Sequence, residues 1–409
     1  MGNFIGIDLG TTYSLVTHFD QAARPKIIED EESNKMTPSC VWFKESAVSV
    51  GREGRIMLGL DKGVFARFKR EMGTDYKYNL DGNEYSATQL SSEVLKKLYK
   101  SATDKLGEVS EVVITVPANF SSEARVQTKK AAQLAGIDSV KLTDEPTAAA
   151  LYYAFERGGS LNGNYAVYDL GGGTFDISIV NIDGFKVKVL ATDGIARLGG
   201  DDFDQILQKI VNQKFLDETT EELDEEDFTR TDAEEQKKSL STRDVQIRLN
   251  RKNYLVTQDE FTDAITSSIK KTERVCKSAL SESGLMPSDL EEVFLVGGST
   301  RIPIVEEAIK NVFKMPPTST VNVDEAVALG ASIYASLDGK DLTVDQKDVL
   351  EKIKVQDVTP RYFGIIAKEK DTKRNKEIEI NSIIIPKNTQ RPCADTKPYF
   401  TTEDNQTGV

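Results

Sequence analysis

Two short segments of the chain place an aspartate before a glycine-rich turn. Residues 4–20 read FIGIDLGTTYSLVTHFD, and residues 165–183 read YAVYDLGGGTFDISIVNID. In each segment an apolar strand ends at Asp-Leu-Gly, a Gly/Thr turn follows, and a second alternating strand begins. The backbone N–H groups of such a turn can approach a phosphate, and the carboxylates of Asp8 and Asp169 could hold the water shell of Mg²⁺. One such turn alone is as easily a simple hairpin, but two together favour a phosphate clamp.

The two turns recur at the distance of a domain, since Asp169 follows Asp8 by 161 residues. This internal repeat predicts two similar α/β lobes that face each other. A third small turn lies in FLVGGSTRIPIVEEAIKNVF (294–313), where an apolar strand precedes a helix. A P-loop is excluded because GxxxxGK[ST] is absent. A Rossmann fingerprint is excluded because the glycines at 171–173 precede the strand-like TFDISIV.

Composition limits the remaining classes of protein. The 409 residues exceed one domain of roughly 150 residues, and 39% hydrophobic with 29% charged residues indicate globular units. A net charge of −14 argues against non-specific binding to nucleic acid or anionic membrane. Three scattered cysteines (Cys40, Cys276, Cys393) and a single histidine (His18) exclude a disulfide framework and His-based zinc sites. With no signal peptide and no apolar run long enough to span a membrane, we expect a reducing, cytoplasmic location.

Helical periodicity and composition divide the chain further. Helices are expected at 87–106, 122–135, 146–157 and 258–284. The acidic stretch 217–235 is interpreted as a solvated helix or loop face. Residues 338–356 are charged, without an obvious strand, and are interpreted as a linker with one short helix over 343–353.

After residue 357 the pattern changes to short strands. Three are expected: RYFGIIAK (361–368), KEIEINSIIIP (376–386) and KPYFTT (397–402). Three strands are too few to close a β-sandwich, so we expect the first part of an all-β unit.

Six motifs that follow one another along the chain are a more specific signal than composition or periodicity. The motifs are IGIDLGTTYSLV, VVITVPANFSSEARVQTKKAAQLAGI, LTDEPTAAALYYAF, VYDLGGGTFDISIV, RLGGDDFD and FLVGGSTRIPIV. Together they closely resemble the seventy-kilodalton heat-shock chaperone family over residues 2–337. The resemblance implies an actin-like ATPase with duplicated ribonuclease-H-like lobes at 1–337 and a linker at 338–356. At 357–409 it implies the N-terminal fragment of a β-sandwich peptide-binding domain.

The resemblance assigns roles at the phosphate end of a nucleotide site. Lys69 matches the lysine that orients the attacking water and the γ-phosphate; without the resemblance it would be one of many surface lysines. Glu145 matches an acidic residue that orders Mg²⁺ waters; alone it would be a helix cap. Asp8 and Asp169 are the other candidates for the metal, and Asp169 or Asp176 would activate or position the water, which leaves the general base open. The matched phosphate loops comprise Gly10, Thr11, Thr12, Tyr13, Gly171, Gly172, Gly173, Thr174 and Asp176.

Further matches belong to the nucleoside end and to coupling between domains. Pro117 and Arg125 match positions by which the family couples nucleotide state to the peptide domain. The nucleoside matches are Gly199, Gly200, Glu234, Lys237, Lys238, Ser241, Gly297, Gly298, Ser299, Arg301 and Asp324. Without the resemblance, the EEQKKSLS stretch would be an exposed helix end.

Several departures from the family's pattern indicate a divergent, bacterial-type member. The linker reads KIKVQDV in place of a leucine run, which should weaken linker docking or shift it to other contacts. Lys141 stands where many members have arginine, and a lysine cannot form the same bidentate pair. Asp144 replaces a common asparagine, and Lys368 lies near a position that is usually apolar.

The resemblance therefore implies an ATP-dependent molecular chaperone that uses ATP or ADP with Mg²⁺, and possibly K⁺. Expected partners are a J-domain co-chaperone, a nucleotide exchange factor and unfolded polypeptide, with no nucleic acid or membrane. We expect this chain to hydrolyse ATP but to hold peptide poorly. The alternatives are an actin-fold small-molecule kinase, an actin-like filament, and a nucleotide-sensing scaffold or exchange-factor-like relative without significant turnover.

Overall fold

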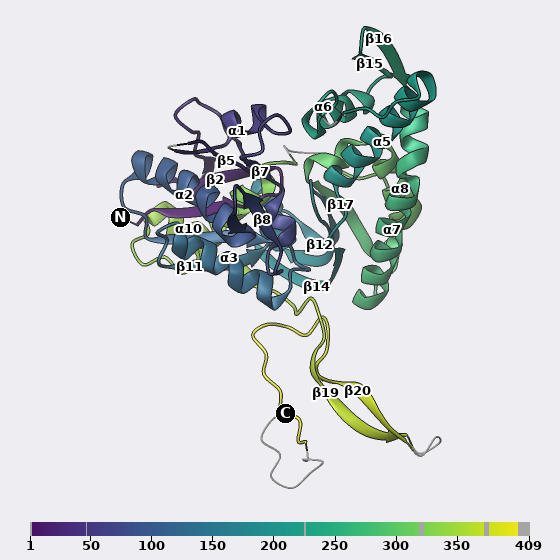
Figure 1. The fold of residues 1–409 in the computed structure, drawn as a ribbon. Coiled ribbons are helices and arrows are strands. Elements are labelled where there is room, and N and C mark those ends of the chain that lie inside the picture. Colours follow the sequence, from purple (N-terminus) through teal and green to yellow (C-terminus); the bar gives the residue numbers. More distant parts are fainter. Residues whose placement is uncertain (1, 46, 225, 319–322, 372–375, 400–409) are drawn as a thin grey trace.

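The computed structural model describes all residues except 1, 46, 225, 319–322, 372–375 and 400–409. Two mixed β-sheets form the body of the molecule, and helices cover their faces (Figure 1). The combination of β-sheets with covering helices confirms the expected α/β class. The first sheet has the order β11-β10-β1-β2-β3, with β4 beside β2. Its strands are β1 (Phe4–Asp8), β2 (Tyr13–Phe19), β3 (Pro25–Ile27), β4 (Thr37–Pro38), β10 (Glu111–Val116) and β11 (Val140–Asp144).

The second sheet has the order β17-β12-β13-β14-β18. Its strands are β12 (Asn162–Leu170), β13 (Phe175–Asp183), β14 (Lys186–Ile195), β17 (Leu290–Val296) and β18 (Lys354–Gln356). Both sheets are built around the same local arrangement. In the first, β1 pairs antiparallel with β2 and parallel with β10. In the second, β12 pairs antiparallel with β13 and parallel with β17. The repeat seen in the sequence is therefore a repeat of topology, with Asp8 and Asp169 at corresponding places.

Two helices rich in small residues, α4 (Glu145–Glu156) and α9 (Ala326–Ser336), lie between the two sheets. Their backbones approach closely, because a Cβ at Gly330 would lie 1.8 Å from the carbonyl oxygen of Ala148. Only glycine fits there. Helix α4 begins with Glu145 and has Pro146 in its first turn, in agreement with the helix expected at 146–157. The two sheets thus share a single tightly packed middle layer.

The outer face of each sheet has its own helices. Helix α2 (Ala87–Leu106) and helix α3 (Ser122–Leu134) pack their buried residues with those of the first sheet. Helix α7 (Gln258–Ser283) and helix α8 (Pro303–Phe313) do the same on the second sheet. The helices expected at 87–106, 122–135 and 258–284 are confirmed. None of the described helices is long and apolar enough to cross a bilayer.

Smaller elements complete the fold. Helix α5 (Gly200–Thr219) and helix α6 (Arg230–Leu240) flank the acidic stretch 217–235, which lies at the end of one helix and the start of the other. The remaining elements are β5 (Cys40–Phe43), β6 (Val48–Val50), β7 (Val64–Ala66), β8 (Lys77–Leu80), β9 (Asn83–Ser86), β15 (Val245–Leu249), β16 (Lys252–Val256), α1 (Arg52–Ile56), and the 3₁₀ turns η1 (Phe68–Glu71), η2 (Pro287–Asp289) and η3 (Gly298–Arg301).

The segment expected to be a strandless linker contains both a helix and a strand. Helix α10 (Val344–Leu350) confirms the short helix expected within 343–353. The absence of a strand was wrong, because β18 adds to the edge of the second sheet, parallel to β14. Ile353 and Val358, on either side of β18, are buried in the cluster between the second sheet and α4. The sequence analysis missed this strand because it has only three residues, too few for a visible alternation.

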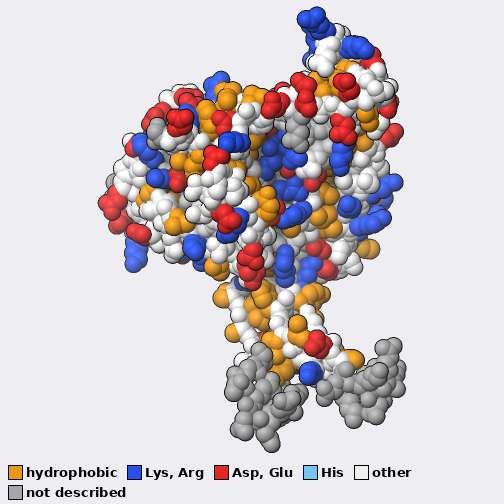
Figure 2. Space-filling view, viewed as in Figure 1, with side chains coloured by type: hydrophobic (Ala, Val, Ile, Leu, Met, Phe, Trp, Pro, Cys, Tyr) orange, Lys and Arg blue, Asp and Glu red, His pale blue; other side chains and the backbone are white. Residues whose placement is uncertain are grey.

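Beyond β18, strands β19 (Phe363–Asp371) and β20 (Lys376–Ile385) form an antiparallel hairpin that projects from the body (Figure 1). These are two of the three expected strands. Residues 397–399 of the third form no strand, and 400–402 lie outside the described residues. Hydrophobic side chains are visible on the projecting hairpin (Figure 2). The exposed hydrophobic residues of its strands include Phe363, Ile366 and Ile383.

Candidate functional site

A cavity of about 590 Å³ lies where the two glycine turns face each other. Most of the residues predicted from the sequence line it, although they come from many separate parts of the chain. They are Asp8, Gly10, Thr11, Thr12, Tyr13, Lys69, Glu145, Asp169, Gly171, Gly172, Thr174, Gly200, Glu234, Lys237, Lys238, Ser241, Gly297, Gly298, Ser299, Arg301 and Asp324. The predicted residues Gly173, Gly199 and Asp176 do not line this cavity, and neither do Pro117 and Arg125.

Two aspartates lie at corresponding strand ends in the cavity wall. Asp8 ends β1, and its Oδ1 accepts a hydrogen bond of 2.8 Å from the Thr115 hydroxyl. Burial raises the pKa of Asp8, and the nearby Lys69 ammonium partly offsets this rise. Burial also raises the pKa of Asp169 well above its ordinary value, and the negative charges of Glu145 and Asp176 add to the effect. Both carboxyls are therefore partly desolvated and lie close to other acidic groups, so that a cation beside them would be strongly stabilised.

Lys69 and Glu145 form a buried ion pair at this end of the cavity. Lys69 Nζ donates to Glu145 Oε1 over 2.6 Å, and both residues are buried. Burial lowers the pKa of Lys69, but the carboxylates of Glu145 and Asp8 more than offset this, so its pKa lies above the ordinary value. Burial raises the pKa of Glu145 to about 7, against the lowering effect of Lys69. This end of the cavity thus holds one ammonium group, that of Lys69, among several carboxyl groups.

Asp176 lies behind the wall of the cavity. It directly opposes Asp169 across the β12–β13 pair, and its Oδ1 accepts a hydrogen bond of 3.1 Å from the Asn119 N–H. Burial raises the pKa of Asp176 to about 8, and the charge of Glu145 contributes to the rise. Asp169 lines the cavity directly, whereas Asp176 reaches it only through neighbouring groups.

The second glycine turn is packed against the start of helix α5. A Cβ at Gly199 would lie 2.6 Å from the carbonyl carbon of Gly172, so this contact needs glycine. The N–H of Gly200 donates to the Gly171 carbonyl over 3.0 Å, and the N–H of Asp201 donates to Gly172 over 2.8 Å. Gly199 therefore shapes the turn from behind, and α5 directs its positive N-terminal end toward the same region.

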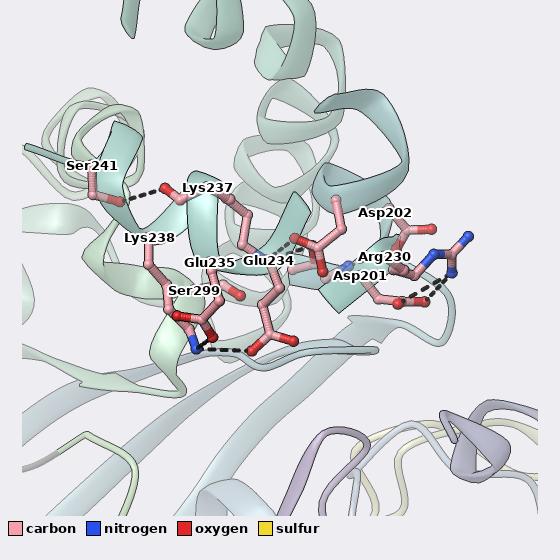
Figure 3. A network of polar contacts seen from close by, with 12 residues as sticks. Asp201, Asp202, Arg230, Glu234, Glu235, Lys237, Lys238, Ser241 and Ser299 are labelled. Carbon is pink, nitrogen blue, oxygen red and sulfur yellow. Dashed lines mark hydrogen bonds and ion pairs between the residues drawn. The ribbon is translucent and has the colours of Figure 1, made fainter. Parts of the chain in front are cut away.

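Helix α6 supplies the opposite end of the cavity, as the close-up in Figure 3 shows. Lys237 Nζ donates to the Gly200 carbonyl over 2.8 Å and forms an ion pair of 2.6 Å with Asp204. Lys238 pairs with Glu234 at 3.0 Å. On the other wall, the Ser299 hydroxyl donates to the Gly171 carbonyl over 2.9 Å. The stretch EEQKKSLS is therefore not an exposed helix end, because Glu234 and Lys237 are buried here.

The structure adds residues that the sequence analysis missed. Arg55 of α1 forms an ion pair of 2.7 Å with Glu234 of α6, and so links α1 to a residue of the cavity lining. Its guanidinium carbon also lies 5.3 Å from the ring centroid of Tyr13. Nothing in the sequence near Arg55 marks it, since its partner is 179 residues away. Asp204, which also lines the cavity, lies four residues after Gly200 on the same face of α5, and this spacing could have identified it.

Pro117 and Arg125 lie outside the cavity, near the C-terminal segment. Arg125 donates to the Ala118 carbonyl over 2.9 Å and forms an ion pair of 2.6 Å with Asp144, the residue before Glu145. Arg391 also pairs with Asp144, at 2.6 Å, and with Asp357 at 2.7 Å. Burial raises the pKa of Asp357 to about 6, with Asp144 adding to the rise and Arg391 opposing it.

The charges of the cavity lining fit a metal-bound phosphate ligand. Four basic side chains (Lys69, Lys237, Lys238, Arg301) face seven acidic ones (Asp8, Glu145, Asp169, Asp201, Asp204, Glu234, Asp324). A bare polyphosphate would be repelled by this excess of negative charge, whereas one that carries Mg²⁺ would not. The described residues contain no cluster of three or more His, Cys, Asp or Glu able to hold a metal ion directly.

A repeated sheet topology with a cavity between the two halves, lined by two Asp-Leu-Gly turns, is consistent with the actin-like class of nucleotide-binding proteins. A comparison with family models then identifies the family. The model of the Hsp70 protein family matches residues 4–409, nearly the whole chain, so the chain belongs to this family. Members of the family are in general ATP-dependent chaperones that work with unfolded polypeptides and co-chaperones.

Proposed function

We propose that this chain binds ATP·Mg²⁺ in the cavity between the two sheets and hydrolyses it, and that hydrolysis controls the binding of unfolded polypeptide. The observation that carries the proposal is the buried Lys69–Glu145 pair at 2.6 Å, in the same cavity as both glycine turns. An ammonium held at this place would stabilise the negative charge that develops on the transferred phosphoryl group. Mg²⁺, held through its waters by Asp8, Glu145 and Asp169, would neutralise charge on the phosphates.

The proposed role of each residue follows from its position in the cavity. Backbone N–H groups of the two turns, with the hydroxyls of Thr11 and Thr174, hold the phosphates. Asp169, in the cavity wall, is the better placed of the two aspartates to accept a proton from water. Asp176, whose pKa burial raises to about 8, acts mainly through the hydrogen bond that it accepts from the Asn119 N–H, which ties β13 to the loop after β10. The α6 residues Glu234, Lys237 and Lys238, with Arg301, hold the nucleoside.

The contacts of the C-terminal segment support a route from the nucleotide to the hairpin. Asp144, next to Glu145, binds Arg391, and Asp357 accepts a hydrogen bond of 3.3 Å from Thr147 on α4. Lys387 pairs with Asp193 at 3.0 Å and with Glu282 at 2.9 Å. These polar contacts compensate for the linker's shortage of apolar residues, as expected for docking that has shifted to other contacts.

Peptide binding and partners belong to the same proposal. The described C-terminal segment forms a two-stranded hairpin with exposed apolar side chains, and two strands are too few to close a β-sandwich. We therefore expect weak or no peptide binding by this chain. A J-domain co-chaperone and a nucleotide exchange factor are the proposed partners, and K⁺ is a possible second cation. Tight, ATP-reversible peptide binding by this chain would contradict this part of the proposal.

Single-turnover hydrolysis of radiolabelled ATP, with nucleotide binding measured in parallel, tests the proposal. Slow hydrolysis that disappears in Lys69→Ala while ATP still binds would support it. ATP binding without turnover in the parent chain would favour a nucleotide-sensing scaffold instead.

A further inference from the structure

A second cavity, of about 670 Å³, lies next to the nucleotide cavity and is lined by arginines. Four guanidinium groups line it: Arg67 and Arg70 around η1, Arg197 before α5, and Arg230 at the start of α6. Three carboxylates accompany them, so the lining has a formal excess of one positive charge. The chain as a whole carries −14. On this face, Lys and Arg side chains gather along the junction between the two halves of the molecule (Figure 2).

The two cavities are separated by a thin wall. Asp201 lines both of them. Its carboxylate is held by Arg67, by Arg70 at 2.8 Å and by Arg230 at 3.3 Å, the last of which is visible in Figure 3. Lys69 and Arg70 are consecutive residues of η1, yet Lys69 lines the nucleotide cavity and Arg70 the second one. The arginine-lined cavity therefore begins at the residue that follows Lys69, the lysine expected beside the γ-phosphate.

The two linings have opposite electrostatic preferences. The nucleotide cavity has an excess of carboxylates and suits phosphates that carry a divalent cation. The second cavity suits a phosphate that carries none, because guanidinium groups bind oxyanions through two parallel N–H groups. Arg197 contacts both oxygens of Glu71 through a single nitrogen, Nη2, at 2.7 and 2.8 Å. Most of its five N–H donors are thus available to a ligand.

From these observations we infer that the arginine-lined cavity is a second binding site for a phosphate-type oxyanion, which can be occupied while nucleotide fills the first cavity. Arg197 and Arg230, the more exposed of the four guanidinium groups, contact the ligand at the mouth, and Arg67 and Arg70 form the deeper wall. The source of the ligand is either inorganic phosphate from solution or the phosphate released by hydrolysis behind ADP. The second source rests on the proposed function.

Equilibrium dialysis of radiolabelled inorganic phosphate against the chain saturated with ADP·Mg²⁺ tests the inference. The test variant is Arg197→Gln combined with Arg230→Gln, since both side chains are partly exposed and their loss leaves the core intact. The matched control is Arg248→Gln combined with Arg274→Gln, which removes the same charge from exposed positions elsewhere. We expect the affinity for phosphate to fall by at least about tenfold in the test variant. It should stay unchanged in the control, with ADP affinity unchanged in both.

Three results would overturn the inference: no binding of phosphate to the parent chain, an equal loss in the control, or a loss in Lys69→Ala but not in the test variant. The last would mean that phosphate occupies the γ-phosphate position. A fluorescent phosphate sensor in single turnovers separates the two sources. A changed rate of phosphate release with unchanged hydrolysis indicates product phosphate, and an unchanged rate indicates phosphate from solution. Because dialysis needs no hydrolysis, it decides the inference even if the chain does not turn over ATP.

Discussion

Lys69 Nζ lies 2.6 Å from Glu145 Oε1, although 76 residues separate the two in the chain. Lys69 comes from the 3₁₀ turn η1 beside the first sheet, and Glu145 is the first residue of α4, the helix between both sheets. The Lys69 ammonium, at the end of the cavity where hydrolysis is proposed to occur, is thus held by α4, which belongs to the layer between the two sheets. Any shift of α4 relative to the first sheet would change the position of the Lys69 ammonium.

Replacing Glu145 tests whether this pair positions the lysine. Glu145→Gln keeps the size of the side chain but removes the charge that holds Lys69. We expect single-turnover hydrolysis to slow by about a hundredfold, as is typical when a reacting group is displaced by about 1 Å. ATP binding should persist at saturating Mg²⁺. Glu156→Gln, at the other end of the same helix, is the control and should leave hydrolysis unchanged. An unaffected rate in Glu145→Gln would mean that Lys69 does not need this partner.

The Arg55–Glu234 ion pair, which joins α1 to a residue of the cavity lining, should slow the escape of nucleotide. Arg55→Ala leaves Glu234 buried without this partner, and a hydrogen bond to a charged group contributes about 1.5 kcal/mol. We therefore expect ADP to dissociate about tenfold faster in stopped-flow experiments. Arg52→Ala, on the same helix α1 but exposed, should dissociate ADP at the parent rate. Equal rates in all three proteins would show that the ion pair does not retain nucleotide.

Arg391 should fasten the C-terminal segment to the body. Arg391→Ala removes the ion-pair partner of Asp357 and one of the two arginine partners of Asp144, the other being Arg125. We expect about 2 kcal/mol less protection of β18 in amide hydrogen exchange. Lys368→Ala, on the exposed hairpin, should have no such effect. A double-mutant cycle with Asp144→Asn isolates the interaction free energy between Arg391 and Asp144. Additive effects of the two substitutions would contradict a direct interaction between them.

The raised pKa of Asp357 predicts a specific dependence of stability on pH. Because burial raises this pKa from 3.8 to about 6, the folded chain binds the proton more tightly than the unfolded chain. The favourable contribution is fully present below pH 3.8 and is lost as the pH rises through about 6. We expect the unfolding free energy of the parent chain to fall over this interval relative to that of Asp357→Asn, measured in denaturant titrations. Parallel curves for the two proteins would contradict the assignment.

Much of this fold could be predicted because its signals are local. The repeated Asp-Leu-Gly hairpins predicted two equivalent halves, and the 3.6-residue periodicity placed α2, α3 and α7 correctly. Strand β18 could not be predicted in the same way. It has three residues, and it exists because the edge of β14 offers unpaired backbone groups to Lys354–Gln356. No property of the segment itself reveals that partner.

The residues of the site also divide into those that a local sequence signal identifies and those that have no such signal. Residues close to the two turns, such as Asp8, Thr11 and Thr174, could be identified from their spacing and motif. Lys69 and Glu234 required the resemblance to a family, because a charged residue in a helix or turn is usually exposed. Arg55 escaped both approaches, since its role depends on a contact with Glu234 that only the folded chain creates.

Single-turnover hydrolysis of ATP by the parent chain, beside Lys69→Ala and Asp176→Asn, tests the central claim most directly. We expect slow turnover in the parent, loss of turnover in Lys69→Ala with ATP binding retained, and partial loss in Asp176→Asn, which removes an ionisable carboxyl behind the cavity wall but keeps the oxygen that accepts from the Asn119 N–H. If the parent binds ATP without turnover, or if Lys69→Ala hydrolyses ATP at the parent rate, the chemistry does not lie at the Lys69–Glu145 pair.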